Sequence, residues 1–258
     1  LMYTRFVRML LLSCICSSSR GQLNESDSLH FQGKAALTGN IQRGNVDVLL
    51  VRSRLEITVA PFRNFVFKSQ NSSLYQEFSS KKADNDIFSR NFIYYQPLNI
   101  IYPFAIAYIS TNYRRKIDAR LFAGAGITYQ LLNKPCHVIK LSANAVYETG
   151  SFNGTVYNYS KYNGSKNINL WRGTLFAGGW NYLFDKKLRF YYDGYWQPAF
   201  NDKNNYRTQF DVGIDFPVWK GLNFTMLYTF THEHVVVAGI KQEDRILTFG
   251  LTYNLRKK

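Results

Sequence analysis

The feature that most constrains the fold is the stretch Arg120–Gln130, in which apolar residues recur at every second position. The apolar set is Leu121, Ala123, Ala125, Ile127 and Tyr129. The alternate set is polar or very small apart from one aromatic residue, and consists of Arg120, Phe122, Gly124, Gly126, Thr128 and Gln130. A period of two predicts a β-strand with two unlike faces.

Nearly all of the chain after residue 28 repeats this alternation in segments of about ten residues or more, which is typical of a transmembrane β-barrel. No apolar run reaches about 18 residues, which argues against a membrane protein built of helices. We therefore predict an all-β fold, an antiparallel up-and-down transmembrane β-barrel of about twelve strands. The predicted strands lie at about 29–43, 46–60, 65–78, 87–97, 102–112, 120–130, 137–150, 168–183, 187–198, 205–216, 222–231 and 244–255.

The connections between these strands alternate in length. Those after even-numbered strands are short, whereas the long ones, 79–86, 151–167 and 232–243, follow odd-numbered strands. Outer-membrane barrels have short periplasmic turns and longer outer loops, so this order predicts an outer-membrane location with both chain ends in the periplasm. Trp171 and Trp180, near opposite ends of one strand, are expected at the two membrane interfaces. A soluble lipocalin-like barrel or sandwich is the alternative architecture, but its outward apolar residues would have no covering layer.

The first 21 residues have the pattern of a secretory signal peptide. Arg5 and Arg8 precede the short apolar stretch Met9–Cys16, and small residues allow cleavage before Gln22. The predicted organisation is a signal peptide at 1–21, a periplasmic lead-in at 22–28 and the barrel at 29–258. Acylation of Cys14 in a lipoprotein is the alternative. Loss of the three arginines in this segment lowers the formal charge from +15 to +12. Cys136 is then the single cysteine, so no internal disulfide is expected.

Charged residues recur at the predicted inward positions of the strands. They form a candidate lumen charge network of Arg52, Arg54, Glu56, Arg120, Lys140, Glu148, Arg189, Asp193, Arg207, Asp211 and Asp215. Such a network either plugs the barrel with ion pairs or lines a selective water path. Arg120 and Arg207 are predicted near the outer ends of their strands. A buried guanidinium is costly without a partner, so at least one of the two is expected to pair with a carboxylate of the inner wall.

Other kinds of site have little support in the sequence. His232–His234 contains two histidines and a glutamate but no third ligand nearby, so no metal site is predicted. No catalytic serine motif or phosphate loop occurs, and neither an enzyme nor a cofactor is expected. The basic residues are scattered and form no tract for nucleic acid. The expected partners are outer-membrane lipid and lipopolysaccharide, with the barrel-assembly machinery during insertion. The oligomeric state stays open.

Several short motifs resemble a known family, the salt-induced outer-membrane proteins of Gram-negative bacteria, long catalogued as a domain of unknown function. The resemblance is carried by Gly39–Asn45, Asp118–Tyr129, Asn205–Arg207 and Leu247–Tyr253. It implies an outer-membrane barrel without an assigned activity. The chain departs from many such barrels by ending in lysine instead of an aromatic residue. Gln22 after a small residue also resembles exported proteins of the Bacteroidetes group.

Two functions follow as hypotheses. The first is a narrow pore or passive envelope component linked to the salt or osmotic response that the resemblance implies. The second is a closed barrel whose external loops bind a ligand, lipopolysaccharide or a partner protein. The Tyr- and Asn-rich connection 151–167 is the candidate for that second role, since exposed loops often carry function.

Overall fold

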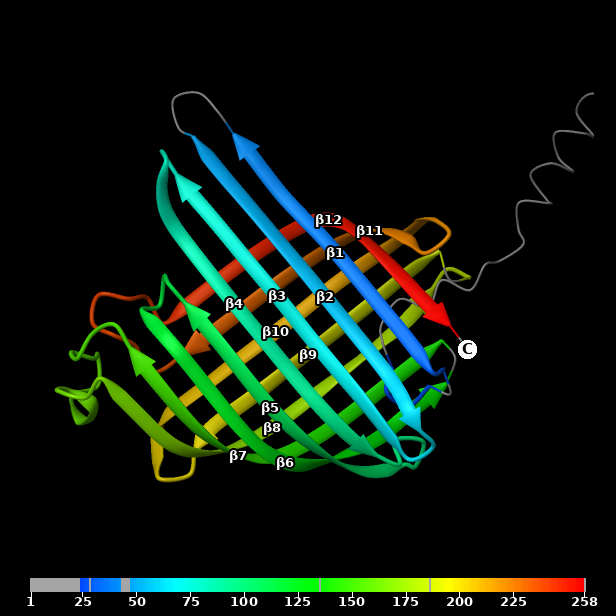
Figure 1. Cartoon of the computed structure of the whole chain (residues 1–258), viewed down its shortest axis with the longest axis horizontal. Coiled ribbons are helices and arrows are strands. Elements are labelled where there is room, and N and C mark those ends of the chain that lie inside the picture. The colour runs from blue at the N-terminus through cyan, green and yellow to red at the C-terminus, as the bar shows by residue number, and fades with distance from the viewer. Residues whose placement is uncertain (1–23, 28, 43–46, 135, 186, 258) are drawn as a thin grey trace, which may run out of the picture.

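The computed structural model describes residues 24–27, 29–42, 47–134, 136–185 and 187–257. Twelve antiparallel strands form a closed barrel in which each strand pairs with its neighbours in sequence and β12 pairs with β1 (Figure 1). The strands are β1 (Phe31–Gln42), β2 (Val48–Phe62), β3 (Phe65–Phe78), β4 (Lys81–Tyr95), β5 (Ile101–Asn112), β6 (Ile117–Lys134), β7 (His137–Phe152), β8 (Asn167–Leu183), β9 (Leu188–Ala199), β10 (Asp202–Trp219), β11 (Leu222–Glu233) and β12 (Glu243–Lys257). The predicted fold and strand number are confirmed. The predicted signal peptide, 1–21, lies outside the described residues.

The two rims of the barrel differ. Phe31 pairs with Lys257, so β1 begins and β12 ends at the same rim, which we call the terminal end (Figure 1). The opposite rim carries the two long connections, 153–166 and 234–242, and we call it the loop end. The first of these contains a short 3-10 helix, Ser160–Tyr162. The part of the chain that the structure describes contains no helix long and apolar enough to span a membrane.

The alternation in β6 separates two environments as predicted. Leu121 and Ile127 are 44% and 56% exposed on the outer wall, whereas Arg120 and Thr128 are buried inside the barrel. Within the inward set, a Cβ added to Gly124 would collide with the carbonyl oxygen of Ala145 on β7. Glycine is therefore needed at this position, because the β6 and β7 backbones approach too closely for any larger residue.

The predicted charged loop at 79–86 is wrong. Ser79 and Ser80 alone make the turn, with φ angles of 48° and 59°, and β4 begins at Lys81. Asp84, placed in that loop by its charge, is 1% exposed and its Oδ2 lies 3.2 Å from Nε of Arg114. The charged residues misled the prediction because they belong to a strand end where their side chains find partners.

The expectation that Trp180 lies at a membrane interface is wrong, whereas the same expectation for Trp171 stays a prediction. Trp171 is 50% exposed on the outer wall, but Trp180 is 8% exposed and packs in the lumen against Val138, Tyr182, Tyr191 and Leu227. The two residues are separated by an odd number of positions, and a period of two then places them on opposite faces.

Substitutions on adjacent residues of β12 test which face meets lipid. Phe249 is 49% exposed on the outer wall, whereas the Thr248 hydroxyl donates to the Leu227 carbonyl. Phe249→Lys is expected to cost about 2–4 kcal/mol of unfolding free energy if the residue sits at the bilayer midplane, and Thr248→Lys far less. Reversible unfolding in lipid vesicles measures both costs. Equal losses at the two positions would contradict the assignment of faces.

Candidate functional site in the barrel lumen

The lumen contains a cavity of about 280 Å³ that is lined by both charged and aromatic side chains. Aromatic and aliphatic side chains of β4, β5 and β6 form one wall, which comprises Phe88, Phe92, Tyr94, Phe104, Ile106, Tyr108 and Phe122. These rings contact one another, as in the stacked pair Tyr108–Phe122 with centroids 4.4 Å apart. Sequence reasoning missed this wall because both faces of β5 are apolar, so alternation cannot separate inside from outside.

A cluster of ion pairs, the loop-end cluster, crosses the lumen toward the loop end. Arg120 donates two hydrogen bonds to Glu233, at 2.8 and 2.9 Å, across 113 residues of sequence. Glu148 lies between three guanidinium groups, with Arg207 Nη2 at 2.6 Å, Arg172 Nε at 3.2 Å and Arg120 Nε at 3.7 Å. All five side chains are about one-tenth exposed or less. Such pairs cross the lumen and hold their strands in one arrangement.

The loop-end cluster continues toward the rim through residues that the sequence did not single out. Arg115 Nη2 lies 2.6 Å from Asp244, and Arg115 Nη1 lies 3.7 Å from Glu233. Arg172 also donates to the side chain of Asn205 at 2.8 Å. Arg115 lies in the turn between β5 and β6, where alternation assigns no face, which explains why it was missed.

A second set of predicted charges lies on β2, β9 and β10. Arg189 forms a salt bridge with Asp215, which also accepts a 2.7 Å hydrogen bond from Thr225. Glu56 accepts a hydrogen bond from Gln70 at 3.3 Å. The remaining predicted residues of this set are Arg52, Arg54, Asp193 and Asp211, and none of them forms a salt bridge within the described residues. Asp193 and Asp211 face each other across the β9–β10 ladder.

The third charge group lies at the terminal end and involves a segment outside the barrel wall. Residues 24–27 of the predicted lead-in enter the lumen, where Glu25 is 6% exposed. Its Oε1 accepts from Lys140 Nζ and from the Tyr102 hydroxyl, both at 2.8 Å, and its Oε2 lies 3.3 Å from Lys68 Nζ. We call this arrangement the Glu25 latch. Lys140 is the one member that the sequence singled out.

The segment is also tied to the wall by neutral hydrogen bonds. The amide of Gln32 donates to the Asn24 carbonyl at 2.8 Å and accepts from the Asn24 backbone N–H at 3.1 Å. Burial alone raises the pKa of Glu25, but the charges of Lys140 and Lys68 outweigh it and hold the pKa below its usual value. Glu25 is therefore ionised at neutral pH while it occupies the latch.

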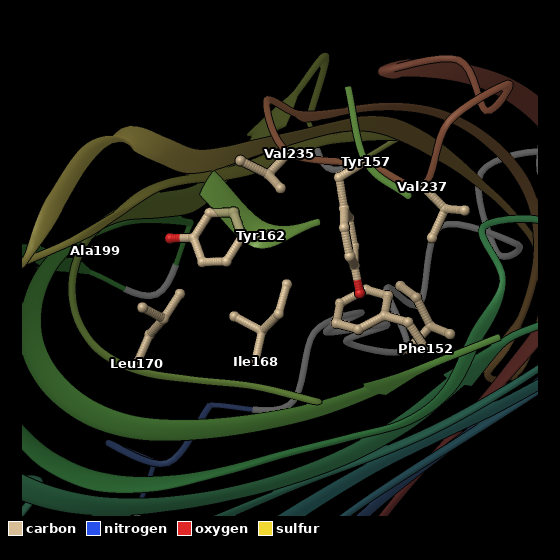
Figure 2. Close-up of a cluster of buried hydrophobic side chains, with 9 residues drawn as sticks. Phe152, Tyr157, Tyr162, Ile168, Leu170, Ala199, Val235 and Val237 are labelled. Carbon is tan, nitrogen blue, oxygen red and sulfur yellow. The ribbon is translucent and has the colours of Figure 1, made fainter. Parts of the chain in front are cut away.

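Beyond the loop-end cluster, the two long connections cover the loop end with an apolar layer, the outer cap. Tyr157 and Val237 form an isolated antiparallel bridge between the connections. The rings of Tyr157 and Tyr162 lie among valines of one connection and aliphatic residues of β8 (Figure 2). The buried cluster comprises Ile117, Phe152, Tyr157, Tyr162, Ile168, Leu170, Ala199, Val235 and Val237. The predicted loop 151–167 is thus a packed element.

The side chains of the His232–His234 stretch pack against the barrel wall and the loop-end cluster. Both imidazole rings stack near Tyr206, with centroids 5.6 and 5.0 Å away, and Glu233 between them belongs to the loop-end cluster. No group of three or more histidine, cysteine, aspartate or glutamate residues suited to a metal occurs within the described ranges.

Solved structures with a similar fold are outer-membrane proteins. The NanC porin is 6% identical with a TM-score of 0.50, over 88% of this chain and 99% of that one. The COG4313 outer membrane channel from Pseudomonas putida F1 is 11% identical with a TM-score of 0.46, over 93% and 98%. The translocator domain of the autotransporter NalP from Neisseria meningitidis is 12% identical with a TM-score of 0.45, over 98% and 96%.

At 6% identity, the similarity to the NanC porin extends to the barrel fold alone. No curated protein sequence matches the chain. A family model does match, over residues 35–255, which include all but the first residues of β1 and the last of β12. The chain therefore belongs to the family described as "Protein of unknown function, DUF481".

Proposed function

We propose that the protein is a narrow channel of the outer membrane, held closed at both ends of its lumen. The observation that carries the proposal is the 280 Å³ cavity, which is lined by Glu25 of the latch at one end and by Arg120 and Arg207 at the other. A barrel that was merely filled by its own side chains would leave no such space between its two closures.

The nature of the two closures supports the same proposal. Neither the latch nor the outer cap is part of the strand ladder: one is a four-residue segment and the other is made of connections. Each of these two can move away without breaking the interstrand hydrogen bonds that lipid requires, whereas the loop-end cluster lies on the strands and opens only if its side chains move. The charged lumen and the family resemblance support a link to salt or osmotic adaptation, which forms part of the proposal.

The charge of the cavity favours anions. Among the described residues, seven basic and four acidic side chains line it, a surplus of three positive charges. A positive wall raises the local anion concentration. If the latch segment leaves, Glu25 leaves with it and the surplus increases.

Bilayer conductance tests the channel. We expect the full chain to open rarely and Glu25→Gln to conduct several-fold more often, because an amide loses the charge that two lysines hold. The reversal potential in a salt gradient should show anion preference. Glu77→Gln is the matched control, since Glu77 bonds to Tyr75 on the outward face of β3 and should behave as the wild type. Cation preference would contradict the proposed pore, and the absence of conductance in every variant would leave the binding function.

A second candidate function rests on the outer cap. The two connections are joined by ordered contacts, such as the 2.9 Å hydrogen bond from the Val236 N–H to Asn158 Oδ1. A preformed outer surface of this kind suits binding of an external ligand, lipopolysaccharide or a partner protein. Lipid and lipopolysaccharide at the outer wall, and the barrel-assembly machinery during insertion, are the partners that this location implies.

A further inference from the structure

The site that Glu25 occupies is a preformed anion site of the barrel wall. Its donors come from three strands: Lys68 on β3, Tyr102 on β5 and Lys140 on β7. All three are less than one-tenth exposed, and together they bond both carboxylate oxygens. Two ammonium groups and a phenol at fixed positions recognise a carboxylate wherever it comes from.

The carboxylate itself belongs to a residue that lies outside the strands of the wall. It is carried by the segment 24–27, which is tied to the strands through side-chain hydrogen bonds, such as those between Asn24 and Gln32. Departure of the segment takes away the carboxylate that Lys68 and Lys140 share. A buried cation that loses its counter-charge is costly. The vacated site therefore favours the entry of another anion over water alone.

The surroundings of the site restrict the kind of anion. Tyr102 is in edge contact with Tyr94, with centroids 5.8 Å apart, and Tyr94 lies 5.8 Å from Phe104. These rings lead from the lysines into the cavity, whose aromatic wall continues along β4 to β6. A ring system favours flat apolar groups, which stack or pack edge to face against it. A small inorganic anion would leave this wall unused.

The size of the cavity limits the apolar part of the ligand. A protein cavity of about 150 Å³ accepts benzene. The 280 Å³ here therefore accommodates one substituted ring with a short side chain, in addition to the volume that Glu25 vacates. Larger ligands would require the charge clusters to rearrange.

We propose that Lys68, Lys140 and Tyr102 bind the carboxylate of small aromatic carboxylic acids. In this structure the carboxylate of Glu25 occupies the place of the ligand's carboxylate. The acid replaces Glu25 and its ring lies against the aromatic wall, so that ligand binding and release of the latch are the same event. These acids would also be the solutes that the channel transports. That second statement rests on the proposed channel function, whereas the binding itself does not.

Equilibrium binding to the full chain in detergent tests the proposal, with 3-phenylpropionate as the probe. Titration calorimetry measures affinity, and a change in tryptophan fluorescence that Trp180→Phe abolishes reports the place of binding, because Trp180 lines the cavity. We expect Glu25→Gln to bind the probe at least tenfold more tightly than the wild type, because the internal competitor has lost its charge. The uncharged 3-phenylpropionamide and the ring-free acetate should each bind at least tenfold more weakly than the probe.

Lysine variants on the Glu25→Gln background locate the site. Lys140→Met should lower the affinity for the probe at least tenfold. Lys68→Met should lower it less, because Lys68 lies 3.3 Å from the Glu25 carboxylate and Lys140 lies 2.8 Å from it. Lys161→Met is the matched control, because Lys161 is half exposed and pairs with Asp202 at the loop end. Heat-modifiable migration verifies that each barrel is folded. If Lys140→Met does not fold, Lys68→Met alone decides.

The outcomes separate this proposal from the channel. Equal affinity for acetate or inorganic phosphate would overturn the assignment to aromatic acids, and affinity that neither lysine variant lowers would overturn the site. A barrel that binds the probe but never conducts would remove the channel and keep the site. One that conducts without binding the probe would do the reverse.

Discussion

Replacement of Glu148 by glutamine is expected to lower the free energy of unfolding by about 3–5 kcal/mol, the usual cost of breaking a buried ion pair. Arg120, Arg172 and Arg207 all approach this carboxylate within 4 Å, and Glu148 is 3% exposed. Glutamine preserves the shape but not the charge. Three guanidinium groups then repel one another with Glu233 as the nearest remaining carboxylate.

Denaturant unfolding of the barrel in lipid vesicles measures the loss. The matched control is Glu243→Gln, because Glu243 pairs with Arg245 at 3.1 Å but is about half exposed, and exposed pairs contribute about 0–1 kcal/mol. In the double variant Glu148→Gln/Arg207→Met the two losses should not add, since both residues belong to one pair. A Glu148 variant no less stable than the Glu243 variant would mean that water, and not the carboxylate, solvates the arginines.

The sequence predicts the strands and their faces because lipid contacts one face along the whole barrel. Every second residue of a strand must therefore be apolar, and this pattern can be recognised in the sequence. The strands β6 and β10 to β12 can be assigned by alternation alone. The same parity explains why the charged residues selected at inward positions, such as Arg189 and Arg207, are buried in the structure. In β5, where aromatic residues face inward as well, parity gives no answer.

The sequence does not predict which inward residues meet. Arg120 and Glu233 are 113 positions apart, and their contact depends on the stagger of strands around the barrel. Of the carboxylates expected as partners for Arg120 and Arg207, Glu148 contacts both, whereas Asp215 pairs with Arg189 instead. An odd or even position in the strand determines which face of the barrel wall a residue lies on, but its position along the barrel axis determines which residue it pairs with.

The Glu25 latch cannot be predicted from the alternation of residues, for a different reason. Residues 24–27 are too short and too polar to give any period, and their composition fits an exposed lead-in. Their position depends on Lys68 and Lys140, which lie on strands far away in the sequence.

Simultaneous replacement of Arg120 and Arg207 by alanine is expected to destabilise the barrel by at least about 3–5 kcal/mol. Among the described residues, the ion-pair partners that remain are Arg115 for Glu233, at 3.7 Å, and Arg172 for Glu148. The two side chains also line the cavity, so their removal widens the lumen below the outer cap. Thermal unfolding measures the first effect, and bilayer conductance on the Glu25→Gln background measures the second.

Arg245→Ala is the matched control, because Arg245 also forms a salt bridge but its side chain is 67% exposed, and it should change neither property. The two measurements together identify the closure at the loop end. Lower stability with higher conductance means that the loop-end cluster is the constriction. Lower stability with unchanged conductance assigns that role to the outer cap, whose buried cluster includes Tyr157 and Val237 and is formed without the two arginines. If neither property changes, Arg120 and Arg207 are simply solvated, and the ion pairs neither stabilise nor close the barrel.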